Sequence, residues 1–184
     1  MKSLRHIPAL FLMLLLAFSS CQKIQKYPDE PTVEYKDFNL FLSQDALGNT
    51  FLLGELDIGF TDGDGDIGIE QPDSAVLADS LKYNLFLTMW VPDSSKWVKS
   101  DDNAEVQNFR IPYIERTGQN KTLSGTITVS LEYKTIQYDS IRYTFYLLDR
   151  QFHKSNVDTS KTVIFKGLEL DSLGVTGIGN LYPE

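Results

Sequence analysis

The sequence predicts an all-β protein, an antiparallel β-sandwich of about seven or eight strands. Apolar and polar residues alternate along several segments, which is typical of strands with one buried and one exposed face. Turn-forming residues separate these segments, and no segment carries the apolar stripe of an amphipathic helix. The 184 residues suit one domain, and a hydrophobic content of 42% is enough to form a core.

The expected strands follow one another from Thr32 onward. The clearest alternating runs are 38–42, 52–60, 81–91, 127–133 and 141–147. Shorter candidates are 96–99, 109–114 and 162–166, and residues 74–79 are expected to form one helical turn. Two long loops, 61–80 and 100–121, make the domain larger than a minimal sandwich of about 100 residues.

The N-terminus has the layout of a secretory signal peptide. Lys2 and Arg5 precede the apolar run Ala9–Phe18, which is too short to span a membrane. The next residues end in Ser19-Ser20-Cys21 and resemble the lipobox of bacterial lipoproteins, although such boxes usually carry Leu where Phe18 stands. The resemblance implies cleavage after residue 20 and attachment of lipid to Cys21. The alternative is a cleaved signal followed by an incidental cysteine.

Charge and composition exclude several function classes. Loss of residues 1–20 would remove two basic residues and no acidic one, which changes the formal net charge from −8 to −10. Nucleic-acid binding, which needs a basic face, is therefore not expected. Cys21 is the one cysteine of the chain, so the mature protein is expected to have neither an intrachain disulfide nor a cysteine–histidine zinc site.

The chain is expected to have four parts. These are the signal peptide 1–20, the lipidated cysteine with a tether at 21–32, the sandwich at 33–168 and a loosely attached tail at 169–184. Within the sandwich, Ile141–Asp149 followed by Ser155-Asn156-Val157 resembles the last two strands of bacterial immunoglobulin-like modules. The resemblance implies that the sandwich is immunoglobulin-like.

The sharpest local feature is an acidic loop after one of the predicted strands. Asp62, Asp64 and Asp66 alternate with glycines, which let the backbone curl so that the carboxylates converge. Three such groups repel one another without a cation, and their hard oxygens suit Ca²⁺. The pattern is not an EF-hand, because Ile67 stands where that loop needs glycine. The alternative is an acidic turn in which the aspartates cap backbone amides.

Topology predicts a fourth acidic group beside this loop. In an immunoglobulin-like Greek key, the loop after the second strand and the loop between the last two strands open at the same end. We therefore expect Asp149 to join Asp62, Asp64 and Asp66 as a calcium ligand.

Aromatic residues suggest a second binding site. If residues 92–95 form a hairpin loop, Trp90 and Trp97 lie directly opposite each other, with Phe86 on the same outward face. Such a strip could stack on sugar rings or on a partner protein. The alternative is that the segment 100–121 folds over this face and buries it.

The acidic loop also carries a resemblance. Small lipoproteins of Bacteroidetes-type bacteria often contain Phe-Thr-Asp-Gly-Asp-Gly-Asp-Ile-Gly after a strand, as at Phe60–Gly68 here. The resemblance implies an envelope lipoprotein and says little of activity. We expect a non-catalytic, lipid-anchored binding or assembly module with a protein or glycan partner, stabilised by calcium.

Two alternatives remain open. One is a carbohydrate-binding accessory of a glycan-uptake system, which would use Trp90 and Trp97. The other is a carboxylate-dependent hydrolase, which needs two carboxylates at a set separation in a cleft, although no acid stands in an apolar context that would tune its pKa. A Ser-His-Asp triad is not favoured, because its base would have to be His153 in a predicted loop. In lipoproteins of this kind, acidic residues directly after the cysteine are associated with display on the cell surface. Because Gln22–Lys26 is basic or neutral, we expect the protein at the outer membrane, on its periplasmic face.

Overall fold

The computed structural model describes residues 26–71, 82–100, 107–115, 121–135 and 137–168. This part of the chain is all-β and contains no helix, so it has none that could cross a membrane. Its nine strands are β1 (Thr32–Gln44), β2 (Thr50–Asp62), β3 (Leu85–Asp93), β4 (Lys96–Lys99), β5 (Gln107–Phe109), β6 (Leu123–Tyr133), β7 (Ser140–Leu147), β8 (Asp158–Thr159) and β9 (Val163–Ile164). The predicted helical turn at 74–79 and the segments 1–20 and 169–184 lie outside the described residues.

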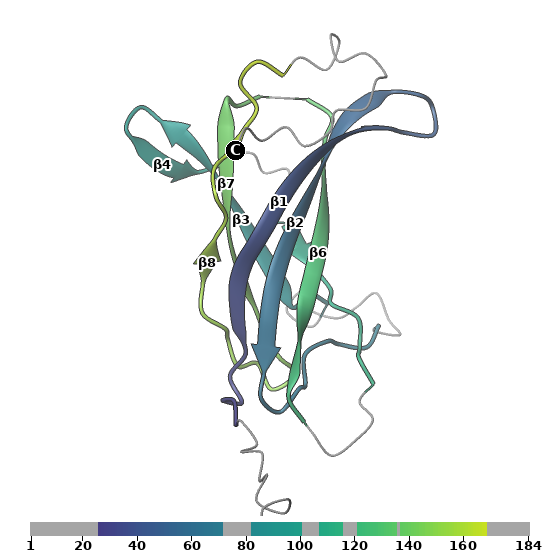
Figure 1. Cartoon of the computed structure of the whole chain (residues 1–184), viewed down its shortest axis with the longest axis vertical. Helices are drawn as coiled ribbons and strands as arrows, with labels where there is room; N and C mark the ends of the chain where they lie inside the picture. Colours follow the sequence, from purple (N-terminus) through teal and green to yellow (C-terminus); the bar gives the residue numbers. More distant parts are fainter. Residues whose placement is uncertain (1–25, 72–81, 101–106, 116–120, 136, 169–184) are drawn as a thin grey trace, which may run out of the picture.

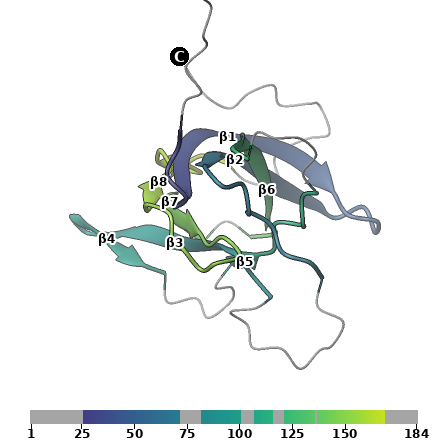
Figure 2. The same cartoon turned by 90° about the horizontal axis from the view of Figure 1, so that it is seen from below.

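The strands form two antiparallel sheets. One has the order β1-β2-β6, and the other has the order β4-β3-β7-β8, with β5 paired to β3 and β9 paired to β7. The two sheets lie over each other as separate layers, with β1, β2 and β6 in one and β3, β4 and β7 in the other (Figures 1 and 2). An immunoglobulin-like sandwich has this arrangement, with β1, β2 and β6 in one sheet and β3, β7 and β8 in the other. The predicted fold class is therefore confirmed.

The core lies between the sheets and follows the predicted alternation. On β7 the buried residues alternate with half-buried ones, and on β2 the buried residues include Leu52, Leu56 and Ile58. The ring of Phe38 on β1 stacks on that of Tyr143 on β7, with centroids 6.3 Å apart, and so joins the two layers. Alternation does not predict strand β8, because two residues are too few to show it, whereas the resemblance to immunoglobulin-like modules implies a last strand beside Ser155-Asn156-Val157.

Side chains also tie the sheets together along the outer edge of β1. The Asn156 amide accepts a hydrogen bond from the Val33 N–H (2.8 Å) and donates one to the Val33 carbonyl (2.9 Å). Asp158 accepts from the Tyr35 N–H (2.6 Å). The Ser155 hydroxyl accepts from the Leu147 N–H on β7 (3.0 Å). The Ser-Asn pair therefore binds the end of β7 to the edge of the other sheet.

Candidate metal centre

The acidic loop begins where β2 ends, at Asp62, and its glycines are required by close approaches of the backbone. A side chain at Gly63 would collide with the backbone of Tyr27 and Pro28, and the Gly63 N–H donates to the Pro28 carbonyl (2.9 Å). Gly68 has a φ of 94°, and a side chain there would meet the Pro112 carbonyl oxygen. These two glycines fix the ends of the loop, and residues 27–28 of the predicted tether lie against it.

Asp62 is fully buried, and one of its oxygens organises the loop. Its Oδ2 accepts hydrogen bonds from the backbone N–H of Asp66 (2.7 Å) and of Ile67 (3.2 Å). This is the capping role that the plain-turn alternative assigned to the aspartates. The other oxygen does not take part in it, because Oδ1 of Asp62 is buried and accepts no hydrogen bond in the structure.

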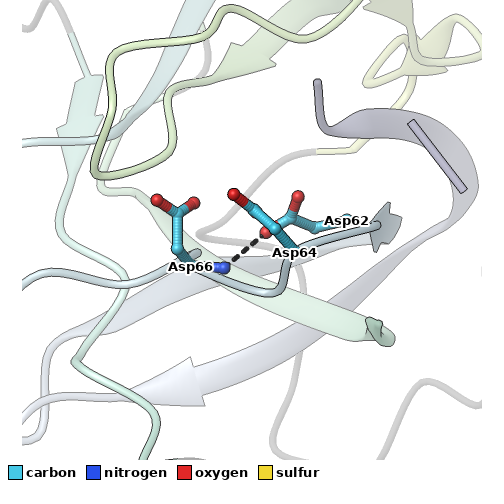
Figure 3. Close-up of side chains that lie close together, drawn as sticks. All are labelled: Asp62, Asp64 and Asp66. Atoms are coloured by element: carbon cyan, nitrogen blue, oxygen red, sulfur yellow. Dashed lines mark hydrogen bonds between the residues drawn. The ribbon is translucent and has the colours of Figure 1, made fainter. Parts of the chain in front are cut away.

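The three carboxylates converge on one point. One oxygen from each of Asp62, Asp64 and Asp66 lies within 4.8 Å of the others, and the side chains point to the same side of the loop (Figure 3). Oδ1 of Asp66 is also buried and accepts no hydrogen bond. A buried carboxylate oxygen without a donor carries a desolvation cost that a bound cation would remove.

Electrostatics at the loop have the direction expected of clustered acids. Burial, and next the nearby Asp64 carboxylate, raise the pKa of Asp62 to about 6. Burial also raises the pKa of Asp66, with further contributions from Asp149 and Asp64. Ionisation of these groups near neutral pH therefore lowers the stability of the folded protein when no cation is bound.

The loop between β7 and β8 does open at the same end, as the topology predicts. The Arg150 N–H donates to the Asp66 carbonyl (3.3 Å), so the two loops are in direct contact. Asp149 is nevertheless not one of the converging ligands. Its buried carboxylate accepts from the His153 N–H (2.8 Å) and lies 2.8 Å from His153 Nδ1, and this pair raises the pKa of the histidine. The expected fourth ligand is instead engaged in holding its own loop.

Gln151 occupies the position expected for Asp149. Its Nε2 donates to Asp64 Oδ2 (2.7 Å) and lies 3.3 Å from Asp66 Oδ2. Sequence reasoning missed this residue because a lone glutamine in a loop has no motif. Its one signal in the sequence is its position, two residues after Asp149 in the loop that the topology places beside the acidic loop.

The predicted aromatic residues lie on the outward face of the sheet β4-β3-β7-β8, called the second sheet below, but their pairing differs from the prediction. The turn has two residues, Ser94 and Ser95, and Ser94 adopts a φ of 55°. Trp90 is therefore paired with Lys99 and Trp97 with Pro92, so the expectation that the tryptophans are directly opposite is wrong. They remain on one face as diagonal neighbours, and both are half-buried. Phe86 shares this face and stacks on Tyr146 at 5.0 Å.

Cys21 and the signal peptide lie outside the described residues, so lipidation remains an expectation. Comparison of the chain with protein-family models, with curated proteins and with solved structures found no match.

Proposed function

We propose that this protein is a non-catalytic, lipid-anchored binding or assembly module of the outer membrane, on its periplasmic face. We further propose that a bound Ca²⁺ ion stabilises the end of the sandwich that carries the acidic loop 62–66. The observation that carries the proposal is the convergence of three carboxylates, two of which present buried oxygens that accept no hydrogen bond. Calcium takes six to eight oxygen ligands in flexible geometry, which suits a loop rich in glycine and aspartate.

The residues present fit such an ion. Asp62, Asp64 and Asp66 would supply carboxylate oxygens, and backbone carbonyls and water would add to them. The Gln151 side chain already contacts two of the carboxylates through its amide nitrogen. A turn of that amide would present its oxygen instead, since the two ends of an amide are interchangeable in shape. An ion bound in this way would tie the loop after β2 to the loop after β7.

The stabilised end is the one at which the chain emerges from the tether, because residues 27–28 contact Gly63. A calcium ion there would set the direction in which the domain leaves its lipid anchor. This supports a role in binding or assembly close to the membrane, rather than catalysis.

Titration calorimetry of the purified full chain tests the calcium site directly. Ca²⁺ should bind with a stoichiometry near one, and Asp64→Asn should weaken it by at least about tenfold, since a charged ligand is lost. Asp93→Asn is the matched control, because Asp93 is exposed in the β3–β4 hairpin. Absence of calcium binding to the wild type, or equal binding by Asp64→Asn, contradicts the proposal.

A second candidate function is carbohydrate binding by the outward face of the second sheet. The specific observation in its favour is that Phe86, Trp90, Trp97 and Tyr146 lie on one face and none of them is fully buried. Aromatic rings of this kind bind the apolar faces of sugar rings.

A further inference from the structure

We propose that the outward face of β3, β4 and β7 binds an acidic polysaccharide, one that carries carboxylate or sulfate groups on its sugar rings. This inference deepens the second candidate function and rests on it. It is independent of the calcium site, which lies in the loop that follows β2 at one end of the sandwich.

The face is continuous across the strands. Register places Phe86 beside Tyr146, Thr88 beside Thr144 and Trp90 beside Arg142, all pointing away from the core. Trp97 on β4 adds a second indole at the end of this row. The indole N–H of Trp90 donates to the Thr144 hydroxyl (2.9 Å), which fixes the orientation of its ring.

Cations accompany these rings. The Arg142 guanidinium lies over the Trp97 ring, 4.5 Å from its centroid, and the Lys154 ammonium lies 3.8 Å from the centroid of Tyr146. Lys99 also occupies an outward position, opposite Trp90. The face therefore combines flat apolar surfaces with positive charge, in a chain whose formal net charge is −8.

Arg142 is the residue that points most directly to an anion. Its Nε is buried and has no hydrogen-bond partner, and no ion pair of its guanidinium occurs among the described residues. The outward positions of β3, β4, β5, β7 and β8, as far as they are described, carry no acidic residue. Since Nε is buried, the terminal nitrogens Nη1 and Nη2 are the donors left for a ligand, and a guanidinium already oriented by stacking can present this pair to the two oxygens of a carboxylate or sulfate.

Charge complementarity selects the ligand class. A neutral sugar would use the rings and leave the Arg142 donors unpaired, whereas an acidic sugar would use both. Nucleic acid also combines rings with anions, but proteins that bind it present an extended basic surface. This face offers Arg142, Lys154 and Lys99 in a chain whose formal net charge is −8. Oligo(dT) is therefore the competing probe in the test.

The test exploits the fact that Trp90 and Trp97 are the only tryptophans of the chain, so intrinsic tryptophan fluorescence reports on this face alone. Polygalacturonate, alginate and chondroitin sulfate are titrated into the full chain in EDTA, which removes calcium from both protein and polysaccharide. Fully methyl-esterified polygalacturonate is the matched neutral probe, and oligo(dT) is the nucleic-acid probe. Gel retardation in the same polysaccharides provides a second readout.

We expect at least one acidic polysaccharide to change the fluorescence saturably. Arg142→Gln and Trp97→Ala should each weaken binding by about tenfold, the value of one charged hydrogen bond or one stacked ring. Lys36→Gln, on β1 of the other sheet, should bind like the wild type. Circular dichroism melts establish that each variant is folded.

Three results would overturn the inference, and they differ in what they leave standing. Equal binding of esterified and free polygalacturonate removes the acidic ligand and leaves neutral carbohydrate binding in place. No binding of any polysaccharide removes the second candidate function as well. Equal binding of oligo(dT) shows that the face recognises anions without selecting sugars. None of these results bears on the calcium site.

Discussion

Asp62 shows that the two alternatives drawn from the sequence, a plain turn and a cation site, do not exclude each other. Its Oδ2 caps the backbone of Asp66 and Ile67, and its Oδ1 is buried and accepts no hydrogen bond. The motif itself predicts both the turn and the cation, because both need an aspartate at this position. Only the structure shows that the turn uses one oxygen and leaves the other without a donor, since that division depends on how the backbone curls between Gly63 and Gly68.

The raised pKa of Asp62 gives the calcium-free protein a pH-dependent stability. Its folded pKa is about 6 against a reference value of 3.8, so the folded state holds this proton to higher pH than the unfolded chain. Stability should therefore fall as the pH rises from about 4 to 6, and level off above that. Melting temperatures between pH 4 and 7, in buffer stripped of calcium, should show this fall relative to Asp62→Asn, which has no carboxyl to ionise. Parallel curves for the two proteins would contradict the assignment.

Gly68 offers a second test at single-residue scale. Alanine there must adopt a φ of 94° and place its methyl group against the Pro112 carbonyl. The backbone conformation alone should cost at least about 1–2 kcal/mol, or roughly 2–4 °C per kcal/mol in a protein of this size. Gly48→Ala is the matched control, because its φ of 84° is similar but nothing crowds its side-chain position. Gly68→Ala should lose more stability than Gly48→Ala in thermal melts, and an equal loss would argue against tight packing of the acidic loop.

Among the elements, the edge of β1 shows how side chains can take the place of a neighbouring strand. Asn156 and Asp158 bond three backbone groups of Val33 and Tyr35, so part of that edge is closed to other chains. These bonds explain why a Ser-Asn pair follows β7, as in the immunoglobulin-like modules that this segment resembles. The sequence shows the pair, but it does not show that Asn156 binds the backbone of β1.

Asn156→Ala should therefore loosen the contact between the sheets. It leaves the N–H and the carbonyl of Val33 without their partners, at an expected cost of about 1–3 kcal/mol in the free energy of unfolding. Chemical denaturation measures this, and Asn39→Ala is the control, because the half-buried Asn39 of the same strand donates to the side chain of its neighbour Asp37 rather than to the other sheet. Similar losses for the two variants would show that the clamp contributes little.

The strand pattern itself was well predicted from sequence, whereas pairing details were not. Period-2 alternation identified β1, β2, β6 and β7 because each buries one face against the other sheet. The β3–β4 register was wrong because it depends on whether the turn has two residues or four, and Ser94-Ser95 carries no glycine to mark it. Gln151 was missed for a related reason, since its role arises from contact between loops about 85 residues apart.

At the scale of the whole molecule, the two proposed sites have separate structural bases. The acidic loop belongs to the end of the sandwich where the tether enters, and the aromatic face belongs to the outer surface of one sheet. An anchored module of this design would keep its membrane-proximal end rigid and present a lateral surface to its ligand. Perturbing one site should leave the other intact.

The anchor is tested by one substitution. Cys21→Ser removes the thiol to which lipid would be attached, so the mature protein should move from the detergent phase to the aqueous phase when cells are fractionated with a phase-separating detergent. Asp93→Asn, which leaves the N-terminus unchanged, should remain in the detergent phase. Unchanged partitioning of Cys21→Ser would show that the protein is not held by a lipid on this residue.

The most direct test of the central claim is the thermal unfolding of the wild-type protein in EDTA and in millimolar calcium, beside Asp64→Asn under the same conditions. An ion that binds the folded state alone stabilises it by mass action, by about 2.7 kcal/mol at a hundredfold excess over the dissociation constant. The wild type should therefore melt several degrees higher in calcium, and Asp64→Asn should show a smaller difference. Identical melting temperatures of the wild type in the two buffers would contradict the account and leave Asp62–Gly68 as a rigid acidic turn.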